Sequence, residues 1–197
     1  MTNILPLAER VLVAASMCQR VMAHLDLWWL TAGEDGRFAH QEVLEEYWEH
    51  IRFLEHGQLV TAVCELHNLL DGKKNTVNLP SLVKEMDPTG RKFSGARVHL
   101  GHVETAFDKI RRLRNNVFAH RTMKKAYNDV FIDAKISPDQ LRSSGALCVS
   151  VCDELLASLG LDPIFVSDLP QKSYSDMLLK LRQPGTDREI FRKSIPF

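Results

Sequence analysis

Residues 95–120 read GARVHLGHVETAFDKIRRLRNNVFAH, and this stretch decides the fold class. Its apolar residues recur every three or four positions, which is the spacing of one face of an α-helix. The residues of this face are Leu100, Val103, Phe107, Ile110, Val117 and Phe118. A long helix with one apolar face has to bury that face against other helices, so the stretch predicts a helical bundle.

The same spacing recurs before this stretch. Residues 5–30 predict a long first helix, which we expect to end at Gly33 and Gly36. Residues 40–70 predict either two helices joined at Gly57 or one helix kinked there. Together these patterns predict an all-α, antiparallel helical bundle with a long first helix.

Two helix starts are marked by their capping residues. Asn78-Leu79-Pro80 combines an N-cap with an early proline and predicts a short inserted helix that ends near Met86. Ser137-Pro138-Asp139-Gln140 is a capping box with proline at the first helical position, and it predicts a helix that ends at Gly160. Residues 129–136 alternate weakly, as a strand would, and we expect a loop there.

The pattern changes after the last predicted bundle helix. Prolines at 163, 170, 184 and 196 leave room for one short helix near residues 173–181. We therefore expect a bundle domain over residues 1–160 and a proline-containing C-terminal tail over residues 161–197, which lies on the bundle or on a partner.

The charge balance gives no long-range attraction to nucleic acid or to an anionic membrane, because 25 basic residues face 25 acidic ones. Any basic site must therefore be local. Charged residues interrupt the apolar first thirty residues, so we expect no membrane span and no signal peptide. The four cysteines form no C-x-x-C pair, which favours reduced thiols and a cytoplasmic location.

Arg114 falls in the middle of the apolar face of residues 95–120. Burying an isolated charge costs on the order of several kcal/mol. Arg114 must therefore meet a carboxylate, reach water in a cleft, or bind an anionic ligand.

Residues 109–125 contain seven basic residues and no acidic one. Such a run is usually a solvated helix face, but next to Arg114 it also suits a phosphate, because a guanidinium matches two phosphate oxygens. The candidate RNA-binding or phosphate-binding residues besides Arg114 are Arg111, Arg121, Lys124 and Lys125.

Arg114 and His120 together suit one reaction class, the cleavage of RNA by its own 2'-hydroxyl. That reaction needs an acid or base, for which His120 is the candidate, and a cation for the transition state, for which Arg114 is the candidate. Asn115 or Asn116 would orient His120 or the phosphate. The chemistry needs no metal and no cofactor, and we expect neither.

The spacing of the two residues raises a geometric difficulty. On an ideal helix His120 lies about 120° around from Arg114 and about 9 Å along the axis. The helix could fray at His120, Arg114 could reach along the groove, or two chains could bring both copies into one cleft. The last possibility predicts a homodimer with a composite site.

At this point the residues resemble a known family, the HEPN superfamily, whose signature is an arginine followed within a few residues by a histidine. Trp28-Trp29, the turn Asn78-Leu79-Pro80-Ser81-Leu82 and the segment from Leu113 to Arg121 resemble its abortive-infection AbiU-like branch over about residues 5–160. The resemblance implies a dimeric helical bundle that cleaves RNA in bacterial toxin-antitoxin or phage-defence systems. It nominates Arg114, Asn115 and His120, and an antitoxin protein as a possible partner.

Two other functions stay open. The chain could be a non-catalytic HEPN dimer that holds a nucleotide or RNA in the same groove, or an interaction module in which Arg114 forms a structural ion pair. His99 and His102 lack a third ligand at a convincing spacing, so we expect no metal site there. The acidic cluster of Glu45, Glu46, Glu49 and His50 predicts a solvated face, or a counter-charge for Arg114 or for the basic patch of a second chain.

Overall fold

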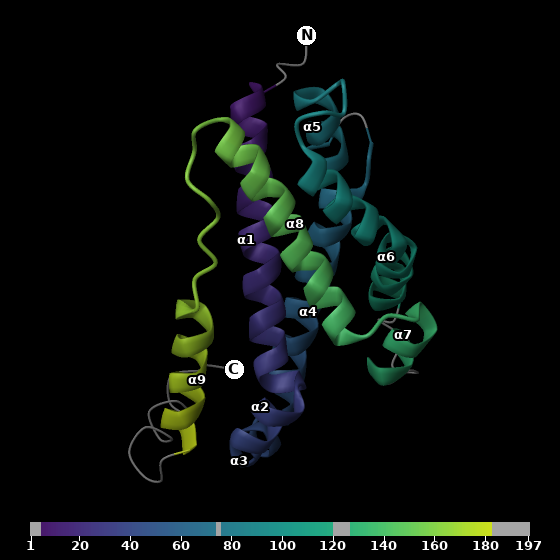
Figure 1. Ribbon diagram of the computed structural model, residues 1–197. Helices are drawn as coiled ribbons and strands as arrows, with labels where there is room; N and C mark the ends of the chain where they lie inside the picture. The colour runs from purple at the N-terminus through teal and green to yellow at the C-terminus, as the bar shows by residue number, and fades with distance from the viewer. Residues whose placement is uncertain (1–4, 74–75, 120–126, 183–197) are drawn as a thin grey trace. The chain divides into compact units, whose positions relative to one another are not determined.

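The computed structural model describes residues 5–73, 76–119 and 127–182, and the elements in this part of the chain are all helices (Figure 1). Their bounds are α1 Leu7–Ala32, α2 Glu34–Ala39, α3 Gln41–Glu46, α4 Trp48–Leu70, α5 Leu79–Met86, α6 Ser94–Ala119, α7 Tyr127–Ala134, α8 Pro138–Ser158 and α9 Leu169–Arg182. The all-α prediction, with a long first helix and a short inserted helix, is confirmed. None of the helices described is long and apolar enough to cross a bilayer.

The chain divides into two compact units. Unit 1 comprises residues 1–22 and 60–166, and unit 2 comprises residues 23–59 and 167–197. Helices α1 and α4 contribute residues to both units. The predicted domain boundary at residue 160 stays a prediction, because a division into compact units does not show which segment folds by itself.

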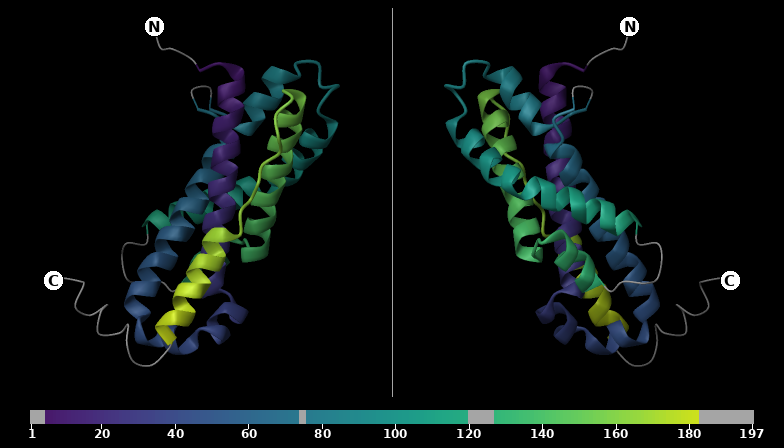
Figure 2. Two further views of the ribbon diagram at one scale, coloured as in Figure 1. Left: turned by 90° about the vertical axis from the view of Figure 1, so that its left-hand side faces the viewer. Right: turned by 90° about the vertical axis from the view of Figure 1, so that its right-hand side faces the viewer.

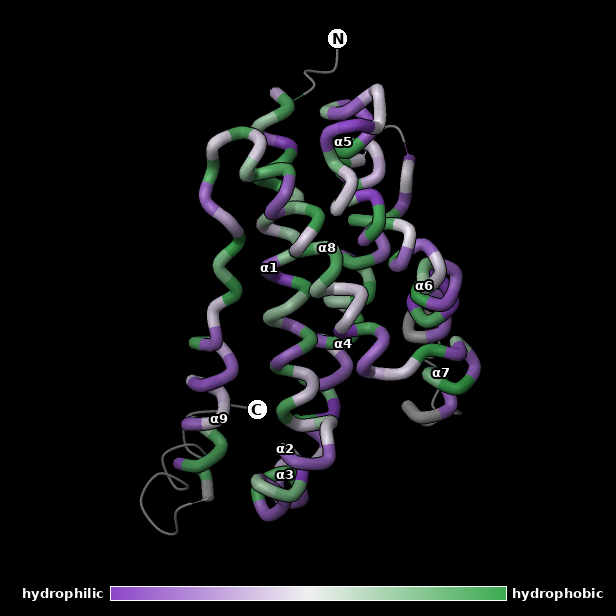
Figure 3. The backbone as a smooth tube through the Cα atoms, in the orientation of Figure 1, coloured by the Kyte–Doolittle hydropathy of each residue, from purple (hydrophilic) through white to green (hydrophobic). Residues whose placement is uncertain are grey.

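In unit 1, α6 packs along α8 and against α7, and α5 packs against both α6 and α8 (Figures 1 and 2). Hydrophobic and hydrophilic residues alternate around these helices, as the hydropathy colours of Figure 3 show. The fully buried apolar side chains include Val11, Leu66, Leu79, Leu82, Ile110, Leu113, Leu141 and Leu155. Burying each such side chain contributes roughly 1.5 to 3 kcal/mol, so this core holds the helices that carry the motif.

The predicted caps of unit 1 are present. The Asn78 side chain accepts a hydrogen bond from the Ser81 backbone N–H at 2.9 Å and so begins α5. At the start of α8, Ser137 Oγ accepts from the Gln140 N–H and the Gln140 side chain accepts from the Ser137 N–H, both at 3.1 Å. Each bond satisfies a backbone donor that the first turn of a helix leaves free.

Asp87 organises the chain between α5 and α6. Its buried carboxylate accepts hydrogen bonds from the backbone N–H groups of Arg91, Lys92 and Phe93 and from the Thr89 hydroxyl. Arg97, from the first turn of α6, adds an ion pair at 3.3 Å. These donors hold the pKa of Asp87 far below its ordinary value, although its burial alone would raise it. The carboxylate therefore anchors the start of α6.

All four cysteines are free thiols, as predicted. Cys18, Cys148 and Cys152 are buried in unit 1, and burial raises the pKa of Cys148 to about 12. A thiol with so high a pKa is a poor nucleophile. Cys148 therefore serves as a small apolar side chain of the core, in which Cys18 and Cys152 are buried as well.

Unit 2 has its own apolar cluster, in which α3 packs against α9. The buried members are Val43, Leu44, Ile51 and Leu178, with Leu30, Tyr47, Tyr174 and Leu181 partly buried around them. The helix predicted near residues 173–181 is α9, and its Leu178 is fully buried in this cluster. The cluster of Glu45, Glu46 and Glu49 is exposed to solvent, as its solvated-face prediction requires.

The helix break predicted near Gly57 lies elsewhere. Helix α4 runs without interruption through Gly57, and the break falls at Tyr47, between α3 and α4. Gly36 does not end the first helix but lies inside α2, where an added Cβ would stand 1.8 Å from the Leu30 carbonyl oxygen. A Cβ added at Gly57 would meet no neighbour, whereas Gly36 permits a close approach of the backbone. The position of a glycine in the sequence does not distinguish these two cases.

The loop predicted over residues 129–136 was also wrong. Most of it belongs to α7, whose Val130 and Ala134 lie one helical turn apart and are both buried. The sequence alternates because a third apolar residue, Ile132, lies between them, but Ile132 is exposed and does not belong to the buried face. Packing against α6 thus selects a helix in a segment too short for its own periodicity to decide.

Candidate functional site

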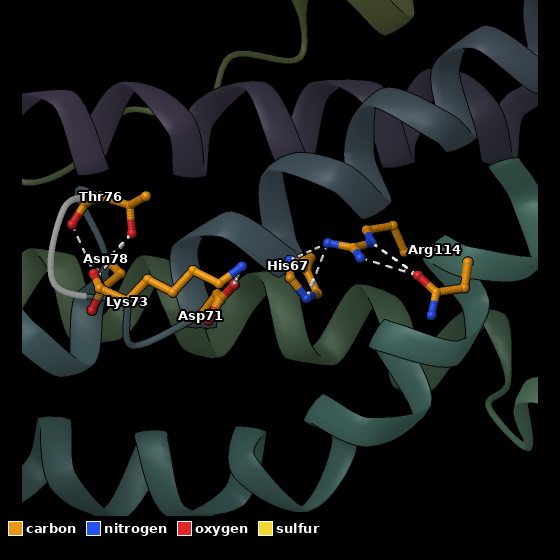
Figure 4. A network of polar contacts seen from close by, with 7 residues as sticks. His67, Asp71, Lys73, Thr76, Asn78 and Arg114 are labelled. Carbon is orange, nitrogen blue, oxygen red and sulfur yellow. Dashed lines mark hydrogen bonds and ion pairs between the residues drawn. The ribbon is translucent and has the colours of Figure 1, made fainter.

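Arg114 projects from α6 towards α4, where His67 lies in the last turn (Figure 4). Its Nη1 atom is 3.0 Å from His67 Nδ1 and 3.3 Å from His67 Nε2. Its Nε and Nη2 atoms donate to the side-chain oxygen of Asn115 at 3.3 and 3.0 Å. The guanidinium is therefore held between a histidine ring and a neighbouring amide.

Nη1 lies within hydrogen-bonding distance of both ring nitrogens of His67, and the tautomer of the ring decides which of them accepts. A guanidinium only donates, and a protonated imidazole has no free acceptor. The contact therefore requires a neutral His67 ring.

The surroundings of His67 keep its ring neutral. The residue is only 3% exposed, and its ring stacks on Phe107 of α6 with centroids 5.2 Å apart. Burial, followed by the positive charge of Arg114, lowers the pKa of His67 below its ordinary value of 6.5. At neutral pH the pair thus carries one positive charge, which resides on Arg114.

No carboxylate in the described part of the chain forms an ion pair with that charge. The ion pairs found there belong to Arg10, Arg20, Lys73, Arg97 and Arg111. The sequence left three environments open for Arg114: a carboxylate partner, water in a cleft or an anionic ligand. The described residues do not provide the first of these. A partly buried cation with neutral partners can still accept an anion.

Asp71 is an acidic residue whose pKa is affected by Arg114, but its carboxylate pairs with another cation. Lys73 pairs with its carboxylate at 2.9 Å, and this hydrogen bond is the main reason that the pKa of Asp71 is lowered (Figure 4). Arg114 and His67 contribute smaller effects to the same pKa. Lys73 thereby offsets the negative charge of Asp71.

Arg114 affects residues at the end of α4 and just after it. Cys64 and His67 of α4 and Asp71, which follows Leu70, are spaced three and four residues apart, and the charge of Arg114 affects the pKa of each one. The Cys64 thiol keeps a raised pKa because its burial outweighs the effect of Arg114. Of the three, His67 alone contacts the guanidinium directly.

The other predicted site residues have different outcomes. Asn115 contacts Arg114, whereas Asn116 is half-buried and its role stays a prediction. Arg111 is exposed and forms an ion pair with Asp108, one residue before the acid-free run begins. His120, Arg121, Lys124 and Lys125 lie outside the described residues, so their placement stays a prediction.

Sequence reasoning missed His67 as a member of this site. A signal was available, because His67 follows the apolar positions Leu59, Val63 and Leu66 and precedes Leu70 on a helix with a buried face. The sequence does not show that His67 contacts Arg114, because the two residues are 47 positions apart. Within the described residues, no group of three potential ligands is placed to hold a metal ion.

A family model described as AbiU2, that of the family HEPN_AbiU2, matches residues 9–168. The chain belongs to this HEPN family. Searches of curated proteins and of solved structures gave no significant match. In this AbiU2-type HEPN chain the matched region includes both His67 and Arg114 and ends directly before α9.

Proposed function

We propose that this AbiU2-type HEPN chain is a metal-independent endoribonuclease that acts as a toxin or phage-defence effector. The observation that carries the proposal is the guanidinium of Arg114, held by His67 and Asn115 without a carboxylate among the described ion pairs. Membership of a HEPN family supports it, because HEPN domains are often ribonucleases.

In the proposed reaction the RNA supplies its own nucleophile. The 2'-oxygen forms a bond to the adjacent phosphorus as its proton passes to a base, and the bond from phosphorus to the 5'-oxygen breaks as that oxygen receives a proton. The products are a 2',3'-cyclic phosphate and a 5'-hydroxyl. No oxidant, metal or cofactor enters this balance.

His120 is the proposed acid or base, and Arg114 the proposed cation that stabilises the extra negative charge on the phosphoryl oxygens. Asn115 would hold the guanidinium in the orientation seen here, and Asn116 would orient His120 or the phosphate. Arg111, Arg121, Lys124 and Lys125 would bind neighbouring phosphates. In a homodimer, both copies of the motif would contribute to one composite site.

The test is cleavage of a structured RNA by the purified full chain in excess EDTA, with the ends of the products identified. We expect cyclic-phosphate ends, and a loss of roughly 100-fold or more in rate for Arg114→Ala and for His120→Ala. Arg112→Ala is the matched control, since it removes an exposed cation from the same turn of α6.

Two outcomes would decide against the proposal. If either variant cleaves as fast as the parent chain, the assigned chemistry is wrong. If the parent chain binds RNA tightly without turnover and Arg114→Ala loses that binding, the non-catalytic HEPN dimer is the correct description.

A further inference from the structure

Unit 2 contains a cavity that plays no part in the proposed function. Its volume is about 140 Å³. The lining residues are Thr31, Arg37, Gln41, Leu44, Glu45, Trp48, Ile51 and Glu55. A cavity of roughly 150 Å³ holds one benzene molecule in an engineered protein core, so this one has room for a ligand of that size.

Glu55 is the unusual member of the lining. Its residue is only 5% exposed, and burial raises the pKa of its carboxyl. The Thr31 side chain and, from a distance, the charges of Arg37 and Arg52 lower this pKa by smaller amounts. Neither arginine appears among the ion pairs of the described residues, so no directly bound cation in that part of the chain balances the carboxylate.

Both neighbouring arginines have other contacts. Arg37 Nε donates to the Thr31 carbonyl at 3.2 Å, and the Arg52 guanidinium lies 5.1 Å from the ring centre of Trp48. Glu55 also lines a smaller cavity of about 70 Å³, together with Tyr174 and Leu54. It thus belongs to the lining of two cavities and forms no ion pair with another described residue.

The lining favours a cation with an apolar body. It contains two carboxylates, those of Glu55 and Glu45, and one guanidinium, that of Arg37. Leu44 and Ile51 supply apolar surface, and Trp48, 44% exposed, supplies an aromatic face that already attracts the cation of Arg52. An ammonium on a flat apolar group would meet the carboxylate and the aromatic ring together.

From this arrangement we infer that the Glu55 cavity binds a small organic cation, an ammonium or amidinium on a flat apolar body, with Glu55 as its counter-ion and Trp48 against its body. The inference does not depend on ribonuclease activity, because every residue that it uses lies in unit 2.

The experiment is calorimetric titration of the full chain at pH 7.5 with benzylammonium chloride, and with benzyl alcohol as a neutral ligand of the same shape. We expect benzylammonium to bind at least about tenfold more tightly than benzyl alcohol, as a charge-assisted hydrogen bond allows. Benzoate should give no binding. Equal affinity for the charged and neutral probes, or no binding of benzylammonium at millimolar concentration, would overturn the inference.

Variants identify the counter-ion. Glu55→Gln keeps the side-chain volume and should abolish the preference for benzylammonium, whereas Glu49→Gln, which removes an exposed carboxylate of the same helix, should leave it intact. Trp48→Ala should weaken both probes, and it gives an independent result if Glu55→Gln fails to fold. An unchanged preference in Glu55→Gln would overturn the inference.

The pH dependence supplies a further test. A bound cation favours the ionised carboxylate, so affinity should be full above the raised pKa of Glu55 and fall as the pH drops through it. The other charged or titratable groups around the carboxyl are Arg37, Arg52, Glu45 and Tyr174. In Glu55→Gln the affinity should be the same at pH 5 and pH 7.5, and a parallel fall in both proteins would contradict the assignment.

Discussion

Arg97 and Arg114 project from the same helix and meet different partners. Near the start of α6, Arg97 Nη2 donates to the Asp87 carbonyl at 2.8 Å and pairs with its carboxylate at 3.3 Å. Near the end of α6, Arg114 contacts the His67 ring and the Asn115 amide. The first arginine shares a buried carboxylate with three backbone donors, and the second has neutral partners.

The difference separates a structural arginine from one that is free to bind. An ion pair with a carboxylate neutralises the guanidinium and uses its donors, so little is left for a ligand. Contacts with neutral groups orient the guanidinium and leave its charge in place. This contrast is the physical basis for assigning the phosphate-binding role to Arg114 and the anchoring role to the Asp87 site.

The largest effect on stability should come from Asp87→Ala. The change leaves the N–H groups of Arg91, Lys92 and Phe93 without their acceptor, and we expect the Tm to fall on the order of 10 °C. Arg114→Ala should shift the Tm by less than about 3 °C. Differential scanning calorimetry measures both, and a larger loss in Arg114→Ala would mean that Arg114 is the structural residue.

Next in size is the effect of His67→Phe on RNA affinity. Phenylalanine keeps the stacking on Phe107 but removes the ring nitrogens that contact Arg114, so the cation should lose its orientation. We expect RNA binding to weaken roughly tenfold, with only a small change in Tm. His102→Phe, at an exposed position of α6, is the matched control. Unchanged affinity in His67→Phe would show that Arg114 needs no support from α4.

A smaller effect concerns stability in mild acid. Because the folded pKa of His67 is lowered, the unfolded chain binds a proton below about pH 6.5 that the folded chain does not. The contribution of His67 is therefore fully present above that pH and is lost as the pH falls towards the folded pKa. Between pH 7.5 and pH 5.5, the Tm of the parent chain should fall about 2 °C more than that of His67→Phe. If the Tm falls equally in the two proteins, the protonation of His67 does not contribute to the pH dependence of stability.

The smallest effect should follow Arg111→Ala. Its ion pair with Asp108 is exposed, and such pairs contribute at most about 1 kcal/mol, so the Tm should not change measurably. If Arg111 contacts RNA phosphate, the slope of log affinity against log salt should decrease by about one unit. An unchanged slope would show that Arg111 does not contact RNA phosphate. Arg114 would then be the remaining candidate of α6 for that contact.

Local signals predicted much of the fold. The caps at Asn78 and Ser137 depend on residues three positions apart, and both are present with their hydrogen bonds. The break at Tyr47 and the helix α7 depend instead on packing against other elements. A glycine such as Gly57 tolerates a helix interior as well as a break, so its presence did not decide between them.

The candidate site was predictable in part for the same reason. The position of Arg114 on an apolar helix face showed that its charge needs a partner or a ligand. Its partner could not be predicted, because His67 belongs to another helix and only the packing of α4 against α6 brings the two together. The neutral state of His67 also follows from burial, which is a property of the assembled unit and not of the local sequence.

Arg114 is available to phosphate because none of the carboxylates in the described part of the chain forms an ion pair with it. His67→Glu tests this directly, since it gives Arg114 the kind of partner that Arg97 has. With the parent chain and His67→Phe measured in the same salt, we expect His67→Glu to have a Tm at least as high as that of His67→Phe and an RNA affinity at least about 100-fold below that of the parent. RNA affinity equal to that of the parent chain would contradict it.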